Sequence, residues 1–204
     1  MGKARVNRAS QVRHGLPSFR RTKRGQKGQL RLGLTGSIAS GKTTVLSLFR
    51  RAGFHAISSD AIVASIYKKW GLTKQKLRAH VAGSERRLRA LEKRVHPVVE
   101  SEIFRLFREN AKKPIVVEVP LLFEAKFDRH FYRNIFVYAH KEHRAKRAVQ
   151  RKMPLGLFYF LEKKQWSASK KAAKADYILH NSGTRLSLQK QVKGLIAFLK
   201  SKSH

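Results

Sequence analysis

A glycine-rich run that ends in a lysine and a threonine is the part of the sequence best suited to chemistry. Gly36 is followed by four free positions and then by Gly41, Lys42 and Thr43. Such a turn points backbone N–H groups inward, and a helix that follows adds the positive end of its dipole. Phosphate oxygens fit this cradle, with Lys42 at the β- and γ-phosphates and Thr43 at a magnesium ion carried by the nucleotide. The run predicts a nucleotide-binding P-loop formed by Gly36, Ser37, Ile38, Ala39, Ser40, Gly41, Lys42, Thr43 and Thr44.

The residues on either side of this loop predict a strand before it and a helix after it. Leu30, Leu32 and Leu34 alternate as in a buried strand, and apolar residues at helical spacing continue to Gly53 (Val45, Leu46, Leu48 and Phe49). A glycine turn without a ligand is the alternative. The strand, loop and helix setting favours the P-loop.

Two carboxylates could act beside the loop. Asp60 follows a short apolar stretch, residues 54–58, and so lies at the carboxyl end of a second predicted strand, which faces the nucleotide in doubly wound sheets. It could accept a proton from an attacking hydroxyl or orient it, and the alternative is a helix N-cap. Glu118 lies within an apolar strand, where a charge needs a partner. It could hold Mg²⁺ through water or pair with an arginine.

An arginine row is followed by an aromatic segment in the C-terminal third. Arg144, Arg147 and Arg151 are three and four residues apart and share one face of a predicted helix, either as a solvated face or to neutralise a transferring phosphoryl group. Residues 152–166 could close as a lid that excludes water, because they combine a proline, a glycine and four aromatic residues (Pro154, Gly156, Phe158, Tyr159, Phe160 and Trp166).

Apolar runs separated by helical segments predict an α/β domain. Further strands are predicted at residues 114–124, ending at Pro120, and at residues 134–139 and 177–179, with a final helix at residues 185–200. A charged, mostly helical segment spans residues 61–110, with interruptions at Gly71, Gly83 and Pro97. Strands that alternate with helices predict a mostly parallel sheet covered on both faces. No His, Cys and Asp group has metal-ligand spacing, and His96 alone is typical of local packing.

Composition predicts one folded domain with a basic extension. The chain has 204 residues, 42% of them hydrophobic, and no cysteine, which excludes disulfides, a thiolate nucleophile and a cysteine zinc site. Residues 1–28 are predicted to be a disordered extension, with a mitochondrial import peptide as the alternative, and residues 29–204 the domain. No apolar stretch approaches the ~20 residues that span a bilayer, so we expect a soluble, cytoplasmic protein.

The net charge is the unusual quantity. Lys and Arg number 46 against 12 Asp and Glu, a formal charge of +34. A phosphate site needs only a handful of these cations. The excess indicates general solvation or attraction to nucleic acid. Basic pairs such as Lys163–Lys164 and Lys170–Lys171 are typical of solvated faces.

Together these motifs resemble the dephospho-coenzyme A kinase family from Leu30 to the C-terminus. The resemblance is carried by LGLTGSIASGKTTV, Asp60, LEKRVHPVV, EVPLLFEAKF, the Arg147–Arg151 stretch and ADYILHNSG. Three features depart from the family pattern. Ser58 stands where an acidic residue is usual, Ser37 and Ala39 replace frequent glycines, and the interval from Asp60 to His96 is short.

The resemblance implies a three-layer P-loop kinase fold that moves the ATP γ-phosphoryl group, with Mg²⁺, to the ribose 3′-hydroxyl of dephospho-coenzyme A. Residues 61–110 would be a helical acceptor-binding insertion. Catalysis would fall to Asp60, Lys42 and Arg147, and Asn181 and Gly183 would join the ATP site. The implied acceptor site is Thr35, Asp60, His96, Pro97, Pro120, Leu121, Leu122, Glu124 and Arg151. The alternatives are a nucleic-acid-binding P-loop protein with weak or lost kinase activity and a kinase for another nucleoside-containing acceptor.

Overall fold

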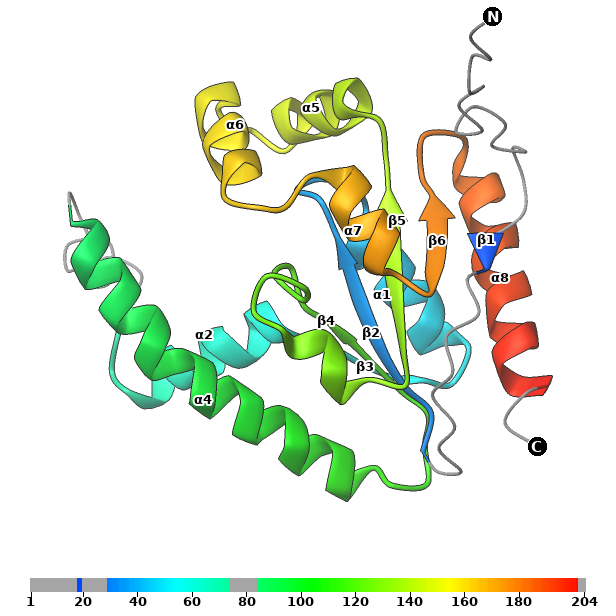
Figure 1. The fold of residues 1–204 in the computed structure, drawn as a ribbon, viewed down its shortest axis with the longest axis horizontal. Coiled ribbons are helices and arrows are strands. Elements are labelled where there is room, and N and C mark those ends of the chain that lie inside the picture. Colours follow the sequence, from blue (N-terminus) through cyan, green and yellow to red (C-terminus); the bar gives the residue numbers. More distant parts are fainter. Residues whose placement is uncertain (1–17, 20–28, 74–83, 202–204) are drawn as a thin grey trace, which may run out of the picture.

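A six-stranded sheet lies at the centre of the computed structural model, which describes residues 18–19, 29–73 and 84–201 (Figure 1). The strand order is β1-β6-β5-β2-β4-β3, and every neighbouring pair is parallel except β1 with β6. The strands are β1 Ser18–Phe19, β2 Arg31–Gly36, β3 His55–Ser58, β4 Ile115–Glu118, β5 Arg133–Tyr138 and β6 Tyr177–His180. The mostly parallel sheet is as predicted. Apart from β1, the predicted extension lies outside the described residues.

Helices cover both faces of the sheet and complete three layers. The helical elements are α1 Lys42–Arg51, α2 Ser59–Lys69, α4 Glu85–Glu109, η1 Phe127–His130, α5 Lys141–Gln150, α6 Leu155–Lys163, α7 Ala168–Lys174 and α8 Arg185–Ser201. One core cluster joins the sheet to α1 and α8, and a second joins its other face to α2, α4 and α7. The α/β fold with helices on both faces is confirmed. No helix in the described ranges combines the length and apolar character needed to cross a bilayer.

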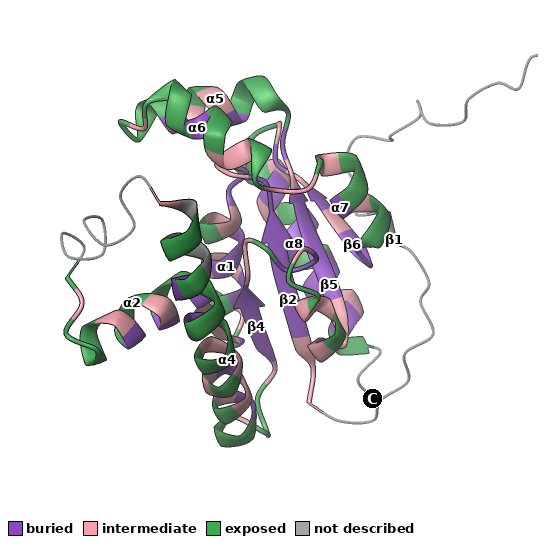
Figure 2. Cartoon of the chain, turned by 60° about the vertical axis from the view of Figure 1, so that its left-hand side comes forward, coloured by how far each residue is buried: buried purple, intermediate pink, exposed green. Residues whose placement is uncertain are grey.

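Alternation along the strands builds the two cores. Leu32 and Leu34 of β2 face α1 and α8, whereas Phe136 of β5 faces the helices on the other side. All three side chains are fully buried, and burial of each contributes about 1.5–3 kcal/mol. Figure 2 shows the result, with buried strands and exposed outer sides on the helices.

Glycines end two helices where the sequence predicts. Gly53 and Gly71 have φ of 90° and 67°, the left-handed region that glycine adopts without strain. After α1, the Phe54 N–H donates to Phe49 O, and after α2, the Leu72 N–H donates to Tyr67 O, which satisfies carbonyls at each helix end. Gly83 lies outside the described residues.

The predicted interruption at Pro97 is wrong, because α4 runs through this residue. A proline removes one backbone donor and crowds the preceding turn. Pro97 itself is exposed, and buried residues on the same helix before and after it, Val95 and Ile103, hold both halves against the protein. This packing outweighs the loss of one hydrogen bond.

The parallel strands bring the candidate residues to one edge of the sheet. β2 ends at Gly36, where the glycine-rich loop begins, and lies in the middle of the sheet. Glu118 at the end of β4 is in register with Leu34 of β2 on one side and with Ser58 of β3 on the other. The loop, Glu118 and the start of α2 therefore meet at the carboxyl ends of adjacent strands.

Candidate active site

The glycine-rich loop, residues 36–41, has a backbone shape that only certain residues permit. Gly41 has φ of 98°, and a Cβ there would lie 2.1 Å from Asn181 Nδ2. A Cβ on Gly36 would lie 2.5 Å from Ser40 Oγ. Asn181 Nδ2 also donates to Ser40 O at 2.7 Å, so this residue, directly after β6, stabilises the loop. Ala39 has φ of 57°, a left-handed conformation that is sterically unfavourable for a residue with a Cβ.

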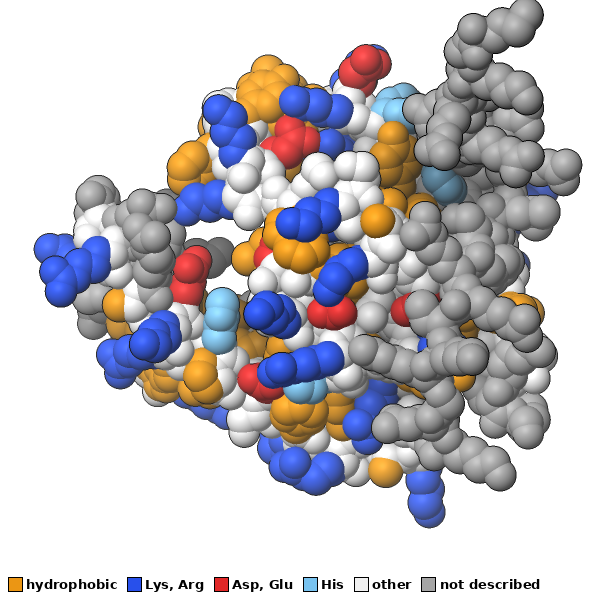
Figure 3. All heavy atoms as spheres, in the orientation of Figure 1, with side chains coloured by type: hydrophobic (Ala, Val, Ile, Leu, Met, Phe, Trp, Pro, Cys, Tyr) orange, Lys and Arg blue, Asp and Glu red, His pale blue; other side chains and the backbone are white. Residues whose placement is uncertain are grey.

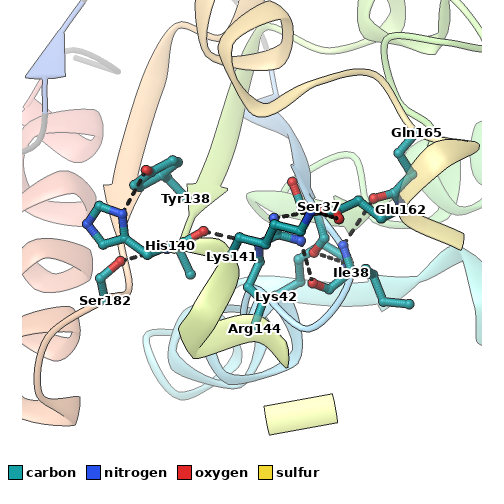
Figure 4. Close-up of polar contacts among 11 residues, drawn as sticks. Ser37, Ile38, Lys42, Tyr138, His140, Lys141, Arg144, Glu162, Gln165 and Ser182 are labelled. Carbon is teal, nitrogen blue, oxygen red and sulfur yellow. Dashed lines mark hydrogen bonds and ion pairs between the residues drawn. The ribbon is translucent and has the colours of Figure 1, made fainter. Parts of the chain in front are cut away.

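Lys42 points back across the mouth of this loop. Its Nζ donates to Gly36 O at 3.2 Å and lies 3.8 Å from Glu118 Oε1 (Figure 4 shows Lys42 beside Ser37). Burial lowers the pKa of Lys42, and the Glu118 and Asp60 carboxylates act in the opposite direction. The Lys42 ammonium is therefore held between carbonyl oxygens of the loop and the Glu118 carboxylate, at the opening of the loop.

Glu118 pairs with Lys42, so the predicted arginine partner is wrong. Its Oε2 accepts a hydrogen bond of 3.0 Å from the Ser58 hydroxyl, the residue that replaces the family's usual acid. Burial raises the pKa of Glu118, while the charge of Lys42 and the Ser58 hydrogen bond oppose that shift. Ser58 thus makes this edge less negative than a second carboxylate would.

Asp60 lies in the first turn of α2, with an exposed side chain. The N-cap of this helix is Ser58, so the alternative that Asp60 is the cap is wrong. A carboxylate in the first turn of a helix interacts favourably with the helix dipole. Ser58, two residues before Asp60, is in register with Glu118, the ion-pair partner of Lys42, so Asp60 and Lys42 lie at the same edge of the sheet.

A hollow of about 240 Å³ opens beside Asp60. The structure brings four of the predicted acceptor residues together in its wall, Asp60, His96, Pro120 and Leu121. The rest of the wall is mainly apolar and comes from α2, α4 and the loop after β4. The polar groups of the wall are two carboxylates, Asp60 and Glu100, the His96 imidazole and the Ser59 hydroxyl, and with the apolar remainder they suit a ligand with a hydroxyl and a flat or aliphatic part. We call this hollow the acceptor pocket.

The other predicted acceptor residues lie elsewhere. Leu122 is fully buried in the core, and Pro97 is exposed on α4 without lining the acceptor pocket. Thr35 is also fully buried and donates to Pro120 O at 3.1 Å. Glu124 accepts a hydrogen bond from the Trp166 N–H at 2.8 Å. Thr35 and Glu124 therefore support the acceptor pocket from behind.

A second hollow, of about 430 Å³, lies on the far side of the loop. It is lined by Gly41, Thr43, Thr44, Ser47, Arg147, Arg151, Asn181, Gly183, Arg185 and Leu188. Arg147 Nη2 donates to Asn181 O at 2.7 Å, which fixes the guanidinium near the start of α1. Arg151, which we expected on the acceptor side, lies here because it is one turn beyond Arg147 at the end of α5.

The three arginines of the row have different surroundings. Arg144 is 5% exposed, its Nε donates to Ala139 O at 3.1 Å, and its Nη2 lies 2.5 Å from Glu162 Oε1 of α6. It joins α5 to the lid segment and does not face the second hollow. Arg147 and Arg151 are the members that line the second hollow.

Sequence reasoning missed two residues around the site. Lys171, read as part of a solvated pair, is fully buried and lies 2.9 Å from both Glu124 Oε1 and Pro120 O. Its helical spacing from Ala168 and Ala175 was the available signal, because those positions share its face. Gln165 was also missed, and its Oε1 accepts from the Ile38 N–H at 3.0 Å. No local pattern distinguishes Gln165 from a surface glutamine.

The basic side chains do not gather into one stripe on the face that Figure 3 shows. Lys and Arg are scattered there among acidic and apolar side chains. This arrangement favours general solvation for that face. Nucleic-acid binding stays a prediction.

Comparison with known proteins gives consistent matches. The family model described as dephospho-CoA kinase matches residues 64–186. A dephospho-CoA kinase from Bartonella henselae is 31% identical over 189 residues, which is 82% of this chain and 97% of that protein. A Thermus thermophilus crystal structure superposes with a TM-score of 0.75 at 26% identity and covers 84% of this chain and 98% of its own. A dephospho-CoA kinase from Campylobacter jejuni shares the fold, with a TM-score of 0.63 at 24% identity over 85% of this chain and 98% of its own.

Proposed function

The chain belongs to the dephospho-CoA kinase family, and on this premise we propose that it transfers the γ-phosphoryl group of ATP to the ribose 3′-hydroxyl of dephospho-CoA. The products are CoA and ADP, so the reaction is the last step of coenzyme A biosynthesis. One observation carries the proposal for this chain. Asp60 lines the acceptor pocket and lies at the start of α2, directly after the strand whose last residue, Ser58, is in register with Glu118, the ion-pair partner of Lys42 in the glycine-rich loop.

The roles of the charged residues follow from their positions. The Asp60 carboxylate orients the acceptor hydroxyl and takes its proton as the oxygen attacks phosphorus. Lys42 and Arg147 stabilise the negative charge that spreads over the phosphoryl oxygens. Amides of the loop bind the remaining phosphates at the start of α1. Catalysis then consists of alignment and charge neutralisation, with little covalent work for the protein.

Magnesium binding fits the residues present. The Thr43 side chain is exposed at the start of α1, and the Glu118 carboxylate lies 3.8 Å from Lys42 Nζ. A hydroxyl, a carboxylate reached through water and phosphate oxygens are ligands that Mg²⁺ accepts. When bound, the ion neutralises charge on the phosphate oxygens. We therefore assign Thr43 as the direct ligand and Glu118 as the ligand through water.

The decisive experiment is an acceptor-dependent phosphorylation assay. Purified protein is incubated with ATP, Mg²⁺ and dephospho-CoA, and CoA and ADP are both measured by chromatography. We expect equal amounts of the two products and none above background from the Lys42→Ala variant. Wild-type protein that gives no more CoA than this variant would reject the proposal. Replacing dephospho-CoA with adenosine or AMP tests the alternative of another nucleoside-containing acceptor.

Two further expectations belong to this proposal. A nucleic-acid-binding protein with lost kinase activity is not favoured, because the chain belongs to the dephospho-CoA kinase family. We place the reaction in the cytoplasm, with mitochondrial import through residues 1–28 as the alternative. N-terminal sequencing of the protein from its own cells would detect a cleaved extension.

A further inference from the structure

Two adjacent residues at the end of the lid segment contact the loops of both proposed substrate sites. Gln165 Oε1 accepts the Ile38 N–H of the nucleotide loop at 3.0 Å (Figure 4). The Trp166 N–H donates to Glu124 Oε1, on the acceptor side, at 2.8 Å. Both contacts come from the connection between α6 and α7, so one short piece of backbone determines both.

The backbone of Ile38 is held by Arg144, which precedes the lid segment, and by Gln165, which lies near its end. Its N–H bonds to Gln165 after α6, and its carbonyl accepts from Arg144 Nη1 of α5 at 3.5 Å. Arg144 is in turn paired with Glu162 inside α6. The next residue, Ala39, has a left-handed φ of 57°. The conformation of the nucleotide loop therefore depends on where the lid lies.

The acceptor half of the connection is rigid. Glu124 Oε1 lies 2.9 Å from Lys171 Nζ, and the same ammonium lies 2.9 Å from Pro120 O. Lys171 is 0% exposed and the Glu124 side chain is 13% exposed, so solvent screens this ion pair less than a pair at the surface. Pro120 lines the acceptor pocket. A ligand that displaces Pro120 would also displace the Lys171 ammonium and its partner Glu124. The Trp166 N–H, which donates to Glu124, would move with them.

We propose that Gln165 and Glu124 are positioning residues that couple the two substrate sites. Each substrate then binds more tightly when the other is present, because each holds the 165–166 backbone in the position that the other requires. This inference rests on the proposed function and deepens it. Coupling of this kind is typically about 5- to 150-fold in affinity and must be the same in both directions.

The test is the affinity for a non-hydrolysable ATP analogue with Mg²⁺, measured by calorimetry with and without saturating dephospho-CoA. For wild-type protein we expect the ratio of the two dissociation constants to be at least about 5. In Gln165→Ala and in Glu124→Ala the ratio should fall to about 1. The control Lys163→Ala changes an exposed lid residue and should keep the wild-type ratio.

A conservative variant separates coupling from a general loss of structure. Gln165→Glu keeps an acceptor for the Ile38 N–H but adds a negative charge near the phosphates. We expect weaker analogue binding with and without dephospho-CoA, and a ratio close to that of wild type. Thermal unfolding of each variant verifies the fold, since losing one such hydrogen bond costs only about 1 kcal/mol.

The outcomes distinguish this inference from the proposed function. Wild-type protein that makes no CoA would overturn both. An active enzyme with a ratio of 1, or one whose folded Gln165→Ala variant keeps the wild-type ratio, would overturn the inference alone. If Gln165→Ala does not fold, Glu124→Ala decides, because it removes the acceptor of the Trp166 N–H from a different element.

Discussion

The nucleotide loop and the acceptor pocket lie at the same edge of the sheet but are built differently. The loop is one continuous segment whose shape is fixed by backbone conformation, with Gly41 in close contact with Asn181. The acceptor pocket is assembled from side chains of α2, α4 and the loop after β4, which are far apart in the sequence. A backbone site is defined by a few spacings, whereas a side-chain site depends on how whole helices pack.

The largest expected effect separates chemistry from binding. Asp60→Asn should lower kcat by about 10²- to 10⁴-fold, because the amide cannot take the proton of the acceptor hydroxyl. ATP binding should change little, since Asp60 lies in the acceptor pocket and outside the loop. Steady-state kinetics and calorimetry give the two quantities. Glu92→Gln, an exposed acid on α4, is the matched control, and turnover retained in Asp60→Asn would remove this carboxylate from the mechanism.

Gly41→Ala tests the backbone site. The new Cβ would lie 2.1 Å from Asn181 Nδ2 at a residue with φ of 98°. Strain of about 1–2 kcal/mol and a displaced hydrogen bond worth about 1 kcal/mol should weaken ATP binding by about 100-fold. Gly194→Ala, in α8, is the control, because no atom lies within 4 Å of its added Cβ and this residue lines neither hollow. Equal affinities in the two variants would show that the loop tolerates rearrangement.

Two neighbouring leucines test the side-chain site. Leu121 is 36% exposed and lines the acceptor pocket, whereas Leu122 is 0% exposed in the core. Leu121→Ala should raise KM for dephospho-CoA about 5-fold, as expected for a loss of about 1 kcal/mol, and leave KM for ATP unchanged. Leu122→Ala should instead lower the free energy of unfolding by about 2–5 kcal/mol. The reverse pattern in kinetics and denaturant unfolding would contradict the assignment.

The pH profile of activity reports on the ion pair between Lys42 of the nucleotide loop and Glu118 at the end of β4. Burial lowers the pKa of Lys42 from its ordinary value of 10.5, so kcat/KM should begin to fall at an alkaline pH below that value. Glu118 favours the charged form of Lys42, so Glu118→Gln should move this limb to lower pH. Residual activity is followed from pH 7 upward. A limb that moves to higher pH in the variant would contradict the pairing.

The smallest expected effect is on stability. Ala39 has φ of 57°, which glycine adopts without a steric cost. Ala39→Gly should raise the free energy of unfolding by up to about 1 kcal/mol, after the greater freedom of glycine in the unfolded chain offsets part of the gain. Ala52→Gly, at φ of −88°, should lower it. Chemical denaturation of both variants measures the difference.

Short-range patterns predicted most of the fold and the glycine-rich loop. The parallel strands, the loop and the glycine ends of α1 and α2 follow from spacing and from local backbone preference, whereas β1 lies in the segment expected to be disordered. Pro97 and Lys171 did not, because their environments are set by residues elsewhere in the fold. The same holds for Gln165, whose partner Ile38 lies 127 positions earlier in the chain. Contacts over such distances leave no trace in local spacing.

The bond between Asn181 and Ser40 spans 141 positions. During synthesis the ribosome releases the N-terminal part first, so the P-loop is exposed long before its support is made. A nascent chain that ends before β6 lacks the amide that underpins the loop. We therefore expect the ability to hold ATP to arise late in translation, once the C-terminal part has joined the sheet.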